Sequence, residues 1–199
     1  MNYNHLVLLG CGSIGGALLK IGRDDLSDFK KVTVIDKEKR ELPNFGNLEF
    51  VAGDLDGPET LKTVLNGTPG SVSLVVNLTE GLDNLAIRRL VSEYHAAYLD
   101  SGAGIIGAFP KESRLSRLMS YNRTLVRSDY PQWTCWGINP GLVELEARKI
   151  LGEFDNPKDC YSIGVFEHDQ LSGQTRAGRK SVGWSPNGLV NEISLTPTF

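Results

Sequence analysis

The fold is decided by residues 5–22, HLVLLGCGSIGGALLKIG. The apolar run over residues 6–9 predicts a buried strand, and the apolar residues after the glycines predict a helix. Three glycines between them have the spacing GxGxxG. Gly10 permits a sharp turn out of the strand, Gly12 lets the backbone approach a ligand, and Gly15 lets the helix pack close to the strand. We therefore predict a strand, a tight glycine turn and a helix.

The glycine turn is typical of a dinucleotide-binding fingerprint. The helix after it would present N–H groups and the positive end of its dipole to phosphates. A second apolar strand, residues 31–35, ends in Asp36, about twenty residues after the last glycine of the motif, where a carboxylate can accept both hydroxyls of an adenosine ribose. The alternative is a turn that uses glycine only for packing. The predicted contacts of the turn with the cofactor are Gly10, Gly12, Ser13, Ile14 and Gly15.

Asp36 predicts NAD rather than NADP, because its charge would repel a 2′-phosphate. Lys37 and Arg40 follow it in the sequence. They keep NADP as the alternative cofactor, because cations just past this strand can accept the phosphate.

Beyond this strand the chain alternates strands and helices, which is typical of a parallel, doubly wound α/β sheet of the Rossmann kind. Further strands are predicted over residues 48–51, 73–78, 96–100 and 133–138. Helices are predicted over residues 58–66, 82–95 and 112–128, and a last one ends near Leu151. The helix over residues 82–95 carries a stripe that we predict to be core, formed by Leu82, Leu85, Ala86, Leu90 and Val91.

Ligands of this fold lie at the carboxyl ends of the strands. This rule places Asp54 and Leu55 near the adenine, and Asn77 and Thr79 between the adenosine and the nicotinamide. For Asp54 the alternative is a capping role for the helix that begins near Pro58.

Composition limits the class of protein. The 199 residues are 40% hydrophobic and 23% charged, which suits one large globular domain or one domain and part of another. A net charge of −3 without a basic patch argues against a nucleic acid partner. The widely spaced Cys11, Cys135 and Cys160 predict free thiols in a reducing compartment and no metal site, with Cys11 a small filler. No apolar span approaches the ~20 residues of a membrane helix, so we expect no membrane contact and a cytoplasmic protein.

The pattern changes near Asn156. Residues 1–155 are predicted to form an NAD(P)-binding Rossmann domain, and residues 156–199 the beginning of a second, α+β domain for substrate binding or dimerisation. Two strands alone are marginal in water. The tail therefore either packs on the first domain or belongs to a larger protein, and a homodimer is one assembly that it would allow.

Three late motifs carry the candidate chemistry. In GINPG, Asn139 sits at a strand tip with an amide that can hold substrate or cofactor, or it is part of a plain strand–turn–helix joint. In FEHD, Glu167 and Asp169 share one strand face and could hold an ammonium group, or they form a solvent-facing edge. In WSPNG, Trp184 offers a ring face that attracts cations, or it is a core residue.

Four motifs in this order, GCGSIGG, INPGLV, FEHDQ and GWSPNGLVNE, resemble the saccharopine dehydrogenase-like superfamily and, within it, most closely the bacterial-type homospermidine synthases. The resemblance implies a redox-neutral reaction on a putrescine-like amine. Hydride transfer to bound NAD oxidises the amine to an imine, a second amine condenses with loss of ammonia, and the same hydride reduces the new imine. It also implies that Asn139 lines the nicotinamide end, Glu167 binds the distal ammonium and Trp184 holds a cationic intermediate.

Two alternatives stay open. A saccharopine or carboxynorspermidine dehydrogenase-type reductase would need cations for the carboxylates of its substrate, and Arg176, Arg179 and Lys180 are candidates. A non-catalytic NAD-binding or sensor protein would keep the nucleotide without turnover.

Overall fold

The computed structural model describes residues 3–39, 41–55, 57–67, 71–79, 82–101, 126–134, 142–154 and 156. Within these ranges the predicted strands assemble into one six-stranded sheet of order β3-β2-β1-β4-β5-β6, and every neighbouring pair is parallel. The strands are β1 (His5–Leu9), β2 (Lys31–Asp36), β3 (Leu48–Ala52), β4 (Ser73–Asn77), β5 (Ala97–Asp100) and β6 (Gln132–Trp133). This strand order confirms the doubly wound Rossmann sheet that the alternation of elements predicts.

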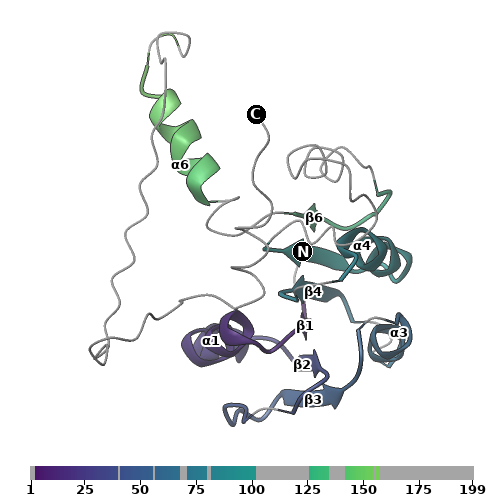
Figure 1. Ribbon diagram of the computed structural model, residues 1–199. Helices are drawn as coiled ribbons and strands as arrows, with labels where there is room; N and C mark the ends of the chain where they lie inside the picture. Colours follow the sequence, from purple (N-terminus) through teal and green to yellow (C-terminus); the bar gives the residue numbers. More distant parts are fainter. Residues whose placement is uncertain are drawn as a thin grey trace, which may run out of the picture.

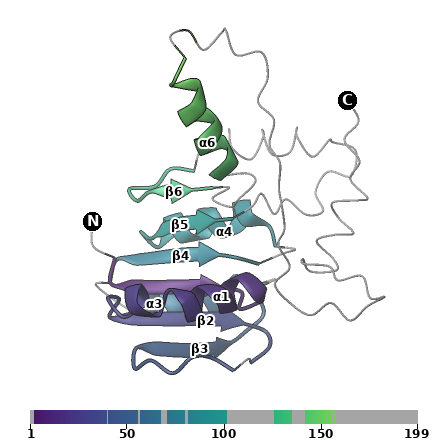
Figure 2. The same ribbon diagram turned by 90° about the vertical axis from the view of Figure 1, so that its left-hand side faces the viewer.

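Helices cover both faces of the sheet (Figure 1). They are α1 (Ser13–Ile21), α2 (Arg23–Leu26), α3 (Glu59–Asn66), α4 (Asn84–Glu93) and α6 (Leu142–Leu151). Helix α1 lies on one side of the sheet, while α3 and α4 lie on the other. Helix α6, which confirms the predicted end at Leu151, lies at the β6 end of the sheet (Figures 1 and 2).

The alternation of side chains along β1 divides the core into two layers. All five residues of β1 are buried. Leu6 and Leu8 pack in the layer under α1, whereas Val7 and Leu9 pack in the layer under α3 and α4. A strand buried on both faces favours apolar residues at consecutive positions, which explains the continuous apolar run over residues 6–9.

The buried face of α4 differs from the predicted stripe. Leu90 and Val91 are buried as predicted, but Ala86 is exposed. Asn84 and Arg88, which hydrophobicity places on the outside, are buried instead. For Asn84 the physical reason is that the sheet presents the buried Asn77 amide at its carboxyl edge, which donates to Asn84 Oδ1 at 3.0 Å.

Two other predicted elements are tested only in part. Residues 126–128 are not helical, so the helix predicted to end at residue 128 does not extend to that point, and the rest of it lies outside the described residues. The predicted strand over residues 133–138 is described only at its beginning, where β6 contains Trp133. The second domain predicted over residues 156–199 lies outside the described part of the chain, apart from Asn156.

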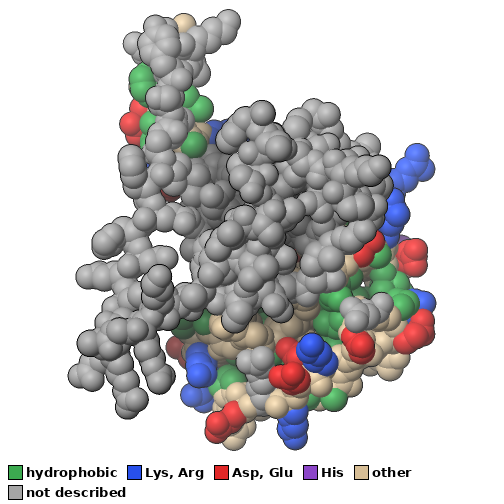
Figure 3. All heavy atoms as spheres, viewed as in Figure 1, with side chains coloured by type: hydrophobic (Ala, Val, Ile, Leu, Met, Phe, Trp, Pro, Cys, Tyr) green, Lys and Arg blue, Asp and Glu red, His purple; other side chains and the backbone are tan. Residues whose placement is uncertain are grey.

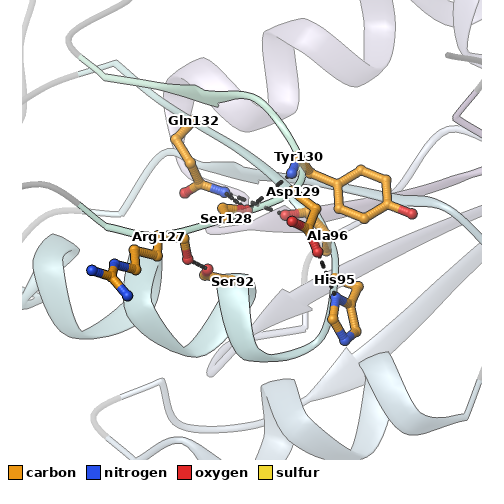
Figure 4. Close-up of polar contacts among 8 residues, drawn as sticks. All are labelled: Ser92, His95, Ala96, Arg127, Ser128, Asp129, Tyr130 and Gln132. Carbon is orange, nitrogen blue, oxygen red and sulfur yellow. Dashed lines mark hydrogen bonds and ion pairs between the residues drawn. The ribbon is translucent and has the colours of Figure 1, made fainter.

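Strand β6 is attached to the sheet by polar contacts at the amino ends of the strands (Figure 4). The Gln132 side-chain amide donates to the carbonyl of Ala96 at 3.3 Å, and the Ser92 hydroxyl donates to the carbonyl of Arg127. The glycine turn follows the carboxyl end of β1, at the opposite edge of the sheet. These contacts therefore hold the fold together and take no part in the candidate site.

His5 begins β1 and is fully buried. One ring nitrogen lies 2.9 Å from the Thr33 hydroxyl and the other lies 3.2 Å from the Ser73 hydroxyl. Burial, together with the nearby charge of Lys31, lowers the pKa of His5 to about 4. The imidazole is therefore neutral in the folded protein at neutral pH and bridges three adjacent strands.

This buried histidine predicts a pH-dependent stability. Between an ordinary pKa of 6.5 and the folded value of about 4, the unfolded chain binds a proton that the folded protein does not. The free energy of unfolding should therefore fall as pH is lowered through this window, by about 3 kcal/mol in total. Urea unfolding at a series of pH values measures the loss. A His5→Gln variant should lose less over the same window, and equal losses in both proteins would contradict the prediction.

The described helices also bear on membrane insertion. Within the described ranges, every helix is too short or too polar to span a bilayer.

Candidate functional site

The glycine turn follows the carboxyl end of β1. Gly10 has a φ of +87°, a backbone conformation that residues with a side chain rarely adopt. Its N–H donates to the carbonyl of Ile35 at 2.9 Å, which joins the turn to β2. A Cβ at Gly10 would lie 2.9 Å from the Thr79 methyl carbon and 3.3 Å from the Leu78 carbonyl oxygen. Gly10 therefore forms the sharp turn out of the strand, as predicted, and packs directly against the chain that follows β4.

The other two glycines of the motif differ in what surrounds them. A Cβ at Gly15 would lie closer than 3.0 Å to the carbonyl oxygen of Gly10, a separation that real Cβ atoms essentially never show. A Cβ at Gly12 would meet no atom of the described residues within 4 Å. Gly15 is thus required by the packing of α1 on the turn, whereas Gly12 faces open space.

The open space lies at the N-terminus of α1. Gly12 is the N-cap residue of this helix and has no side chain that could cap the first N–H groups. The first turn contains no acidic residue, and both Ser13 and Ile14 are exposed. The N–H groups and the positive end of the helix dipole therefore fit an anionic group such as a pyrophosphate.

Asp36 lies beside the turn at the end of β2. One carboxylate oxygen accepts the N–H of Cys11 at 2.6 Å, and the other accepts the N–H of Glu38 at 3.0 Å. An ionised carboxylate has about four acceptor positions, so it can also accept ribose hydroxyls. The Cys11 thiol side chain is buried in the α1 layer of the core, which confirms its prediction as a small filler. The contact between Asp36 and the turn was not predicted, because the two residues are far apart in the sequence.

Asp54 and Leu55 follow β3, next to the end of β2. The N–H of Gly53 donates to the carbonyl of Asp36 at 3.1 Å, which brings the two strand ends together. Asp54 is exposed, and Leu55 packs partly against the core. The N-cap of α3 is Pro58, which makes no side-chain capping hydrogen bond. The predicted adenine contacts thus lie on the same edge of the sheet as the glycine turn, and their contact with a nucleotide stays a prediction.

Asn77 and Thr79 lie at and just beyond the end of β4. The Asn77 amide is buried and donates to Asn84 Oδ1 at 3.0 Å and to Tyr98 Oη at 3.1 Å. Its carbonyl oxygen accepts from the Thr79 hydroxyl at 2.6 Å and from the Thr79 N–H at 3.1 Å. Both residues lie at the predicted edge of the sheet, but the Asn77 side chain is directed into the layer under α4.

A cavity of about 330 Å³ opens beside the turn, between α1 and the loop that follows β2. Its lining residues are Cys11, Gly12, Ser13, Gly16, Ala17, Leu19, Lys20, Glu41, Leu42 and Pro43. The contribution of the loop over residues 41–43 was not predicted, because a polar loop carries no motif that would place it against a helix. Gly12 and Ser13 belong to both the cavity and the open end of α1, so the cavity extends the candidate site.

The described residues contain no group of three or more His, Cys, Asp and Glu side chains that could hold a metal ion. The three predicted catalytic residues, Asn139, Glu167 and Trp184, lie outside the described ranges. On the face shown in Figure 3, acidic and basic side chains of the described residues are interspersed. No single sign of charge dominates the part of this face that is described.

The chain matches a known protein family. A family model described as the saccharopine dehydrogenase NADP binding domain matches residues 6–130, which is more than half of the chain. The matched range contains the glycine turn, Asp36 and strands β2 to β5, together with all but the first residue of β1. No curated protein matches the chain.

Proposed function

The chain belongs to the family of saccharopine dehydrogenase NADP-binding domains, and from this premise we propose that it is an NAD-dependent oxidoreductase-like protein that acts on an amine through an imine. The family supports a pyridine-nucleotide-binding, oxidoreductase-like role. Two observations on the glycine turn support the nucleotide-binding part of this proposal. The space in front of Gly12 is open at the N-terminus of α1, and the Asp36 carboxylate lies beside the same turn.

The residues at this edge of the sheet fit a nicotinamide dinucleotide. The N-terminus of α1 and the backbone of Gly12 would hold the pyrophosphate, because N–H groups and a helix dipole favour an anion there. Asp36 would accept the hydroxyls of the adenosine ribose. When bound, the dinucleotide supplies an acceptor and donor of hydride. The chain contributes binding and orientation of that group relative to the substrate.

For the substrate we propose a putrescine-like diamine in a reaction of the homospermidine synthase type. The support is the resemblance of the late motifs, in which Asn139, Glu167 and Trp184 would face the nicotinamide, the distal ammonium and a cationic intermediate. Contact with the face of the Trp184 ring would stabilise a bound cation by roughly 0.5–2 kcal/mol. The second candidate is a saccharopine or carboxynorspermidine dehydrogenase-type reductase. The NADP in the description of the matched family favours it.

A substrate panel tests the proposal. The full chain is incubated with NAD and putrescine, and the polyamine product and ammonia are measured by mass spectrometry and an ammonia assay. We expect product without a net change in NADH, and no product with a Gly12→Val variant. Consumption of NADPH with a keto acid and an amine would instead establish the reductase. Retention of the dinucleotide without turnover of any amine would contradict both proposed activities and would indicate a non-catalytic dinucleotide-binding protein.

We further propose that the bound dinucleotide is NAD rather than NADP. The Asp36 carboxylate is held beside the turn by two backbone N–H groups and would repel a 2′-phosphate. Lys37 and Arg40, which follow in the sequence, would oppose this effect. We expect NAD to bind about tenfold more tightly than NADP, since a tenfold ratio needs only about 1.4 kcal/mol of unfavourable charge contact.

Calorimetric titration with both nucleotides measures this preference. An Asp36→Asn variant removes the charge and keeps one oxygen as an acceptor for the N–H of Cys11. In this variant the affinity for NADP should rise relative to that for NAD. Tighter binding of NADP than of NAD by the wild-type chain would overturn the assignment.

A further inference from the structure

A buried polar cluster lies under the carboxyl ends of β4 and β5, on the side of the sheet that faces α4. Its centre is Asn77, which is only 2% exposed. Asn84 reaches it from the first turn of α4, and Tyr98 reaches it from β5. Two residues earlier on the same face of β4, Val75 fills the core with an apolar side chain. An apolar side chain at position 77 could fill this layer in the same way, so packing alone does not explain the polar Asn77.

The Asn77 amide uses all of its usual hydrogen-bonding capacity inside the protein. Its nitrogen donates twice, to Asn84 and Tyr98, and its oxygen accepts twice, both times from Thr79. An amide has two donors and an oxygen with two lone pairs. Asn77 thus has no capacity left for a ligand, and half of its bonds go to Thr79.

Thr79 transmits this constraint to the glycine turn. Its methyl carbon lies against Gly10, so close that a Cβ there would be 2.9 Å away. The adjacent Leu78 N–H donates to the carbonyl of Leu9 at 2.9 Å, which fixes the same segment on the end of β1. The turn is therefore held from the β4 side by Thr79, just as Asp36 holds it from the β2 side through Cys11.

We propose that Asn77 is a positioning residue of the dinucleotide site, which fixes Thr79 against Gly10 and so sets the conformation of the glycine turn without touching the nucleotide. This inference rests on the proposed dinucleotide binding. Its physical basis is preorganisation. A turn held in its binding conformation before the nucleotide arrives loses less conformational freedom on binding. The cost of burying an amide is offset because every one of its polar atoms is hydrogen-bonded.

Two variants test the positioning role. Thr79→Val removes the hydroxyl that donates to Asn77 and keeps a methyl group against Gly10, whereas Asn77→Ala removes the whole cluster centre. The glycine turn would contact the pyrophosphate, which ADP and NAD share. Both variants should therefore weaken the binding of ADP and of NAD by the same factor. We expect each affinity to fall about tenfold, which is equivalent to the loss of one hydrogen bond in the upper part of the usual energy range.

The measurement is isothermal titration of the full chain with ADP and with NAD, at a temperature where circular dichroism shows each variant to be folded. Thr63→Val is the matched control, because it removes a hydroxyl bonded to the backbone of α3, away from the glycine turn. Its affinities should equal those of the wild type.

Three results would overturn the positioning role. One is a loss of NAD affinity with unchanged ADP affinity, which would mean that these residues contact the nicotinamide half directly. Another is a loss in Thr79→Val alone, which would mean that Thr79 acts without Asn77. The third is a lower melting temperature with both affinities unchanged, which would mean a purely structural cluster. A wild-type chain that binds neither ADP nor NAD would overturn the proposed function itself, so the two failures are distinguishable.

Discussion

Replacement of Gly15 by alanine should remove a large part of the stability of the fold. The added methyl group would lie closer than 3.0 Å to the carbonyl oxygen of Gly10, and that carbonyl belongs to backbone that cannot rotate away. Relief would require α1 to move off the turn, which would separate the buried Leu19 from the core residues under α1. Overpacking of an interior typically costs about 1–3 kcal/mol and more where backbone is in the way, a large part of the roughly 5–15 kcal/mol that stabilises a domain. Circular dichroism and urea unfolding measure the loss.

Gly16 provides the matched control. It is the next residue of the same helix, and a Cβ there would meet no described atom within 4 Å. Gly16→Ala should raise the stability by up to about 1 kcal/mol, because alanine favours the helix more than glycine does. A Gly15→Ala variant as stable as wild type would show that α1 does not pack on the turn in the way described.

Replacement of Gly12 by valine should abolish dinucleotide binding and leave the chain folded. The φ of −70° and ψ of −153° at Gly12 describe extended backbone with a negative φ, and its Cβ would project into the open space at the end of α1. Valine would fill the volume that the pyrophosphate needs, so we expect at least about a hundredfold loss of NAD affinity, which corresponds to about 2.7 kcal/mol. The fold should lose no more than about 1 kcal/mol, since valine is a poor N-cap residue.

Gly46→Val is the control for this second experiment. Gly46 lies in the loop before β3, at the amino end of that strand, and a Cβ there would also contact none of the described residues within 4 Å. Its NAD affinity, measured by titration on folded protein, should equal that of the wild type. A normal affinity in Gly12→Val would mean that the glycine turn is only a packing device.

The sequence predicted the elements of the site better than the contacts among them. The continuous apolar run before Gly10 predicted a buried strand, because a strand that is covered on both faces has apolar residues at consecutive positions. The spacing between the glycine motif and Asp36 predicted that this acidic residue lies at the end of the neighbouring strand. Both predictions succeeded because they depend on local spacing, which one strand–turn–helix unit determines by itself.

The buried polar cluster could not be predicted in the same way. Tyr98 reaches Asn77 because β5 lies next to β4, and that pairing is a property of the whole sheet. A charged residue on an amphipathic helix is usually exposed, so the sequence gives no reason to expect that Arg88 is buried. Both Arg88 and Asn84 are buried, and Asn84 is buried where it accepts a hydrogen bond from Asn77 of the sheet.

By itself, therefore, the sequence determined a parallel, doubly wound Rossmann sheet, a glycine turn and an acidic residue at the end of β2, because these follow from the period of hydrophobic residues and from backbone sterics at three glycines. Only the tertiary structure decided what holds the turn in place. Asp36 meets the N–H of Cys11 because parallel strands bring their carboxyl ends to one edge of the sheet, whatever the length of chain between them. Asn77 meets Tyr98 because β4 and β5 are neighbours in the sheet.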